Sequence, residues 1–189
     1  MSCRRPAIAS LLVLGAAWGL AESVWFFVVA DVLVTFVALR CGLRAALAVG
    51  LAAALTAPLG GAWLYRLAAE DPAAATTWLA SVPFVGPALI ARGMAAMAEP
   101  FWPLAMLKGS VTGVPYKIFA AGAGAERLPL ALFLALSVPI RFARYAAAAL
   151  AVVLAARLAG TRLGPAGRTV ALAAFWILFY GQFWWRMAA

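Results

Sequence analysis

The chain has 189 residues, of which 67% are hydrophobic and 11% are charged, and its formal net charge is +9. Soluble domains are about half apolar and about a quarter charged. The composition therefore excludes a water-soluble fold and predicts an all-α polytopic membrane protein. The sequence has no histidine, which excludes serine–histidine catalysis and most zinc sites. Nucleic-acid binding is not expected, because no soluble basic domain is present to carry it.

The first apolar block, residues 7–39, is too long to be a single membrane-spanning helix. One crossing needs about 20 residues, whereas this block would be about 50 Å long as a straight helix. It contains Glu22 and Asp31, which would point in opposite directions on such a helix. A helix–break–helix arrangement lets both carboxylates point into the protein, so the block is predicted to be a re-entrant hairpin. Met1–Ala21 has features of a signal peptide, but the apolar run continues to Leu39, which favours its retention.

The rest of the chain is predicted to continue one transmembrane domain that covers residues 1–189. Its remaining elements are a transmembrane helix at 43–69, a second re-entrant hairpin at 84–125, and transmembrane helices at 128–158 and 168–187. This topology keeps most loop arginines on the cytoplasmic side, whereas a series of single crossings would export Arg40 and Arg44. Cys3 and Cys41 lie beside arginines at predicted cytoplasmic ends, which favours free thiols.

A short internal repeat supports this topology. Residues 54–62 align without gaps with residues 135–143, and the match retains identical Ala, Leu, Pro and Ala residues. The two segments lie in the helices that follow the two predicted hairpins, and these helices run in opposite directions. The fold is therefore predicted to contain two inverted repeats, each a re-entrant hairpin plus a transmembrane helix, with an extra C-terminal transmembrane helix. This is the plan of transporters whose sites lie near the bilayer midplane.

Ionisable residues at membrane depth are the candidate site: Glu22, Asp31, Lys117, Arg141 and Arg144. Arg141 and Arg144 lie three residues apart on one helical face, in a block without any acidic residue. An arginine at the bilayer centre costs about 3 kcal/mol and stays charged, so ion pairs with Glu22 or Asp31 are expected. Two guanidiniums can hold a phosphate bidentately, which favours a functional role. The alternative is that the ion pairs only join the first hairpin to the 128–158 helix.

Lys117 follows Gly113–Tyr116, a helix-breaking segment, and begins a new apolar run. Helix N-termini attract anions through their free N–H groups, so a lysine at this position favours a phosphate site. The alternative is that its ammonium extends to a membrane interface. The sequence does not decide between them.

Several motifs, taken in order, resemble those of the DedA family, also called the SNARE-associated or VTT-domain superfamily, and especially its YqaA-like branch. They are Ala21-Glu22, Ala30–Val34, Pro58–Gly61, Arg92-Gly93, Gly113–Lys117, Ala121–Gly124 and Ser137–Tyr145. The resemblance implies paired re-entrant hairpins and a multi-pass location in the bacterial inner membrane. It also implies proton-dependent translocation of undecaprenyl phosphate or phospholipids, with Glu22, Asp31, Arg141 and Arg144 as the functional residues. The chain departs from the family in that residues 25–30 lack the usual Pro/Gly turn.

Together these features predict a lipid transporter, either a flippase or a scramblase, for lipids with a phosphate head group. Lys117, Arg141 and Arg144 would bind the phosphate, while Glu22 and Asp31 would exchange protons. Neither a catalytic residue, a metal nor an organic cofactor is expected, and the predicted partners are anionic membrane lipids and protons. A non-transporting assembly factor or scaffold is an alternative. An enzyme acting on lipid phosphates is less favoured, because the 6 acidic residues are scattered and form no metal motif. The sequence is compatible with a monomer or a homo-oligomer.

Overall fold

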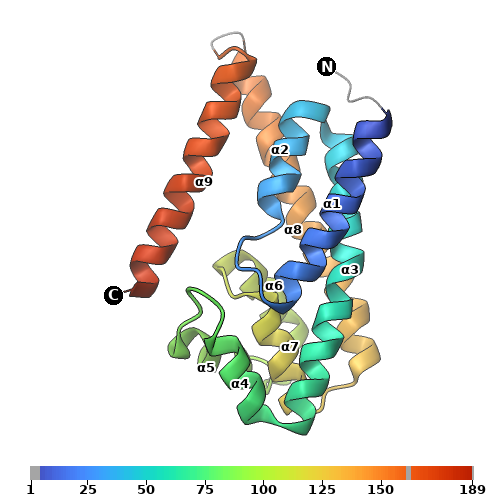
Figure 1. Ribbon diagram of the computed structural model, residues 1–189, viewed down its shortest axis with the longest axis vertical. Helices are drawn as coiled ribbons and strands as arrows, with labels where there is room; N and C mark the ends of the chain where they lie inside the picture. Colours follow the sequence, from blue (N-terminus) through green and yellow to red (C-terminus); the bar gives the residue numbers. More distant parts are fainter. Residues whose placement is uncertain (1–4, 161–162, 189) are drawn as a thin grey trace.

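The computed structural model describes residues 5–160 and 163–188. Within these ranges every regular element is a helix, which confirms the predicted all-α class (Figure 1). The helices are α1 (Arg5–Val24), α2 (Asp31–Cys41), α3 (Leu43–Glu70), α4 (Pro72–Ala80), α5 (Pro87–Ala95), α6 (Trp102–Thr112), α7 (Tyr116–Ala125), α8 (Leu130–Leu158) and α9 (Pro165–Ala188).

Helices α3 and α8 are long and apolar enough to cross a membrane. With 28 and 29 residues, they are each about 42 to 44 Å long, which exceeds the roughly 30 Å hydrocarbon core and leaves room for tilt. They pack against each other and run in opposite directions along the long axis of the molecule (Figure 1). The predicted elements at 43–69 and 128–158 are therefore confirmed as long apolar helices, which supports a membrane location.

The first apolar block is broken near its middle, as its two acidic residues predicted. Helix α1 ends at Val24 and α2 begins at Asp31. In Figure 1, α1 runs from one end of the molecule to its middle, and α2 returns to the same end. The break forms without proline or glycine: the backbone N–H of Phe26 bonds to Ala21 O at 2.8 Å, and the chain then leaves the helix.

The predicted second hairpin, 84–125, consists of three short helices rather than two arms. Proline lies in the first turn of α5 and of α6, where its missing N–H costs nothing. Gly113 ends α6 in the left-handed conformation, with φ of 87°, and Pro115 precedes α7. These four residues lie at helix ends, so they divide the segment into three helices, whereas a single turn would give two.

Two clusters of buried apolar side chains hold the helices together. One is formed by α3 with α4 to α8 and includes Leu64 and Tyr116, while the other is formed by α2, α3 and α8 and includes Val34 and Tyr145. Helix α9, which covers the predicted 168–187 element, lies at the edge of the bundle (Figure 1) and contacts it mainly through α2.

One prediction about the cysteines is wrong. Cys41, at the end of α2, takes part in a disulfide, although its arginine-rich surroundings favoured a free thiol. Cys3 lies outside the described residues.

Candidate functional site

Glu22, in the last turn of α1, joins three segments of the chain. Its Oε1 atom lies 3.1 Å from Nη2 of Arg141 and 3.8 Å from Nη2 of Arg144, both on α8. Its Oε2 atom accepts a hydrogen bond of 2.9 Å from the backbone N–H of Ala30, just before α2. The carboxylate is buried, so these contacts compensate for the water that it has lost.

Asp31, the first residue of α2, forms the second ion pair of the site. Its carboxylate accepts a hydrogen bond from Nη2 of Arg144, and its position at a helix N-terminus also favours negative charge. The Arg144 side chain is 22% exposed, whereas that of Arg141 is 5% exposed. The expected pairing of the two acids with the two arginines is therefore present, and Arg144 is the arginine that remains accessible.

Two tyrosines enclose the guanidinium of Arg141. Its Cζ atom lies 4.7 Å from the ring centroid of Tyr116 and 5.6 Å from that of Tyr145, which are cation–π distances. Nη2 of Arg141 donates to the Tyr145 hydroxyl at 2.5 Å, and this hydroxyl donates to Glu22 Oε2 at 3.3 Å. Nε of Arg141 is buried and has no hydrogen-bond partner among the described residues.

Helix α3 makes room for both tyrosines with glycine. A Cβ atom at Gly61 would collide with the Tyr116 hydroxyl, and one at Gly50 would lie 3.1 Å from Tyr145 Cβ. These glycines are three helical turns apart and therefore lie on one face of α3. Sequence reasoning did not include the tyrosines in the site. The signal for Tyr145 was its position four residues after Arg141, which places it on the same helical face.

Lys117, in the first turn of α7, is 1% exposed. Its Nζ atom donates a hydrogen bond of 2.9 Å to the backbone carbonyl of Phe26. Among the described residues, which include every aspartate and glutamate of the sequence, no carboxylate lies within 4 Å of Nζ. A buried ammonium does not fit the alternative in which this lysine extends to a membrane interface, and its charge has no ion-pair partner within 4 Å among the described residues.

The non-helical segment 25–30 is hydrogen-bonded to side chains from several helices. Irregular backbone at membrane depth requires such partners, because no water is available. Three backbone carbonyls accept hydrogen bonds here: that of Phe26 from Lys117, that of Val28 from Trp18 on α1, and that of Val24, at the end of α1, from Trp78 on α4. Two backbone N–H groups donate: that of Ala30 to Glu22, and that of Val29 to Tyr180 on α9. Glu22 and Lys117 thus also have a structural role in this break.

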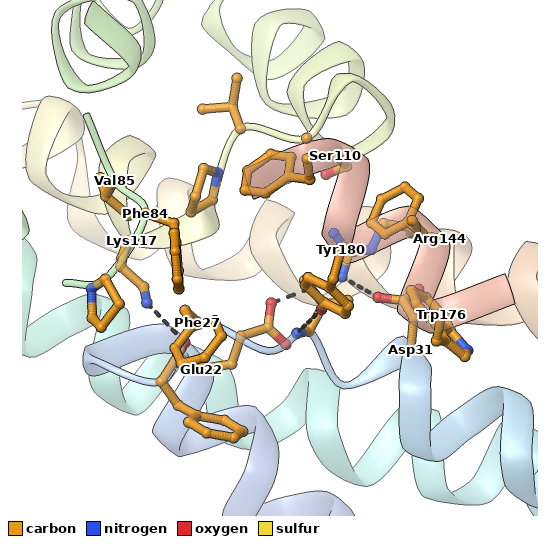
Figure 2. A pocket seen from close by; sticks show the side chains of 18 of the residues that line it. Glu22, Phe27, Asp31, Phe84, Val85, Ser110, Lys117, Arg144, Trp176 and Tyr180 are labelled. Carbon is orange, nitrogen blue, oxygen red and sulfur yellow. Dashed lines mark hydrogen bonds and ion pairs between the residues drawn. The ribbon is translucent and has the colours of Figure 1, made fainter. Parts of the chain in front are cut away.

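A cavity of about 180 Å³ brings four of the five predicted residues together. Its lining contains Glu22, Asp31, Lys117 and Arg144, whereas Arg141 lies behind this surface. Figure 2 shows Lys117 on one side of Glu22 and the Asp31–Arg144 pair on the other. The remaining wall is mostly apolar, and its aromatic residues include Phe27 and Phe84, with Trp176, Phe179, Tyr180 and Phe183 from α9.

The charge of this cluster is unbalanced. Arg141 and Arg144 face the carboxylates of Glu22 and Asp31, so these four groups cancel when all are ionised. The ammonium of Lys117 then leaves one positive charge in excess, in a cavity that is otherwise mostly apolar. A buried charge without a partner is costly, and an anion that enters the cavity would supply that partner.

Comparison of the chain with family models, with curated proteins and with solved structures gives no match. The resemblance to the DedA family therefore rests on the sequence motifs alone.

Proposed function

We propose that this protein is an integral membrane transporter, a flippase or scramblase, for lipids with a phosphate head group. The observation that carries the proposal is the excess positive charge of Lys117 in a cavity that Arg144 also lines. A phosphate could accept hydrogen bonds from both cations, and charge-assisted bonds of this kind are about twice as strong as neutral ones.

The wall of the cavity favours a lipid over a free anion. Phe27, Phe84 and the aromatic residues of α9 surround the charged groups, and an inorganic ion gains nothing from such contacts. A lipid such as undecaprenyl phosphate or a phospholipid would place its phosphate among the cations and its chain along this apolar surface.

Proton coupling follows from the charge balance of the same cluster. A proton taken up by Asp31 would remove the negative charge that faces Arg144, and the net charge would rise from about one to about two. The protonated cavity would therefore attract a phosphate more strongly, and loss of the proton would help to release it. Protonation of Glu22, which faces Arg141 and Arg144, would raise the net charge in the same way, so both carboxylates are the proton-binding residues of the proposed cycle.

We further propose that the chain belongs to the DedA family, with two inverted repeats and re-entrant hairpins in the bacterial inner membrane. The segments 54–62 and 135–143 each contain a proline inside a long helix, Pro58 in α3 and Pro139 in α8. These helices run in opposite directions, as an inverted repeat requires. The segment 25–30 would then lie near the midplane.

A structural role is the second candidate, because Glu22 and Lys117 also bind the backbone of segment 25–30. In that case the protein would be an assembly factor or scaffold, and the charges would affect stability alone.

Reconstitution distinguishes the two candidates. The full chain is placed in vesicles, and the movement of a fluorescent phosphatidylglycerol between leaflets is measured by chemical quenching. Lys117→Gln removes the charge and retains an N–H donor for Phe26 O, so it should preserve the break but lose most transport. Arg66→Gln, an exposed arginine near the end of α3, is the control and should transport normally. Full activity of Lys117→Gln would refute the assigned site.

A further inference from the structure

A second hollow lies further toward the N-terminal end of α9, between α2, α8 and the N-terminal half of α9. Its volume is about 360 Å³, and apart from Arg168 its lining is apolar, with Leu39 from α2, Ala155 from α8 and Leu172 and Phe175 from α9. It shares no lining residue with the central cavity. We call it the α8–α9 groove.

One end of the α8–α9 groove opens into a polar hollow of about 340 Å³. The two share Leu39, Ala156 and Arg168, and the polar hollow adds Arg157 from the last turn of α8. Arg168 is held in place, since its Nε donates to Leu163 O at 3.0 Å and its Nη2 donates to Gly160 O. Neither lining contains an acidic residue.

We propose that the α8–α9 groove is a binding site for an anionic phospholipid, separate from the transport cavity. An apolar trough that faces a bilayer does not stay empty, because lipid chains pack into it. The acyl chain would lie along Ala155 and Leu172, and the phosphate would lie between Arg157 and Arg168. Arginine is suited to this role because its planar guanidinium matches the geometry of a phosphate.

The arginine pair determines which head group is preferred. A cation near the membrane surface favours anionic lipid by about five-fold for each lysine or arginine. A zwitterionic lipid carries its own positive charge, which finds no carboxylate in this groove. Phosphatidylglycerol is therefore expected to bind in preference to phosphatidylcholine.

The bound lipid would also support the wall of the central cavity. Phe175 faces the α8–α9 groove, whereas Trp176 and Phe179 line the central cavity. Helix α9 contacts the bundle mainly through α2, so a lipid between α8 and α9 would fill the space that the protein leaves open.

Photolabelling tests the groove without any transport measurement. The full chain is reconstituted with phosphatidylglycerol that carries a diazirine in its acyl chain, and labelled peptides are identified by mass spectrometry. Phosphatidylcholine with the same chain serves as the comparison lipid. We expect phosphatidylglycerol to label the facing parts of α8 and α9 more strongly, and Arg157→Gln to reduce that labelling about five-fold.

Two further variants separate the site from general membrane contact. Arg44→Gln is the control. Arg44 is exposed and lies two residues after Gly42, which lines the polar hollow, but Arg44 is not part of that lining. Labelling of the Arg44→Gln protein should therefore be unchanged. Ala155→Trp fills the α8–α9 groove, leaves both arginines in place and should remove the label. Equal labelling by the two lipids, or full labelling of Arg157→Gln, would overturn the proposal. Arg157 is exposed, so its loss should not prevent folding.

Discussion

The Glu22–Arg141 ion pair allows a structural role and a transport role to be separated. Arg141→Met leaves the Glu22 carboxylate buried, with its nearest remaining cation, Arg144, 3.8 Å away and shared with Asp31. Removal of one partner of a buried pair costs about 3 to 5 kcal/mol. The cation–π contacts with Tyr116 and Tyr145 are lost as well, so the upper part of this range is expected.

The double substitution Glu22→Gln with Arg141→Met should recover most of that loss. The glutamine oxygen can still accept from Ala30 N–H and from the Tyr145 hydroxyl, and replacement of a buried pair by neutral groups is often nearly neutral for stability. The free energy of unfolding is measured by denaturant titration in detergent, for both single variants and the double variant. A coupling energy of about 2 kcal/mol or more is expected. Additive losses would refute the reasoning that this pair is a coupled, buried unit.

Transport by the double variant then decides the role of the pair. If the residues only stabilise the fold, transport should return together with stability. The proposed function predicts that stability returns and transport does not, because Glu22, which lines the central cavity, no longer binds a proton. A double variant that transports as well as the unmodified protein would contradict the proposal.

Three further predictions concern the residues around the cluster. Gly61→Leu should displace the Tyr116 ring from Arg141 and destabilise the fold by about 1 to 3 kcal/mol through overpacking. Leu59→Ala, on the exposed face of α3, is the control and should be nearly neutral. Thermal unfolding measures the stability of both variants. Tyr145→Phe removes the hydroxyl between Arg141 and Glu22 and should lower the free energy of unfolding by about 1 to 3 kcal/mol. An unchanged midpoint of thermal unfolding would show that this hydroxyl does not contribute to stability. Trp18→Phe leaves the Val28 carbonyl without its donor, so hydrogen exchange should become faster in segment 25–30 and stay unchanged in α8.

Part of this fold and of its charged cluster could be predicted from charge and length alone. Glu22 and Asp31 cannot both point into the protein from one straight helix, and this geometry correctly predicted the break between them. Arg141 and Arg144 needed negative partners at membrane depth, and the block around them contains none. The two acids of residues 7–39 are the partners that the structure provides.

The interactions that hold the break in place could not be predicted. The donors Trp18 and Trp78 and the acceptor Tyr180 lie in three different helices, and nothing in their local sequence indicates a buried partner. Aromatic residues in an apolar helix resemble lipid-facing residues, so the contribution of α9 to the central cavity was not expected. The disulfide at Cys41 could not be predicted either, because the neighbouring arginines are typical of a cytoplasmic end, where thiols stay reduced.

The most direct test of the central claim is a high-resolution structure of the protein in a bilayer that contains undecaprenyl phosphate or phosphatidylglycerol. The proposed function predicts phosphate density in the central cavity, within hydrogen-bond distance of Lys117 Nζ and of the Arg144 guanidinium, with the lipid chain against the aromatic wall. A cavity that contains only water or an acyl chain, with Lys117 still bonded to Phe26 O alone, would contradict it.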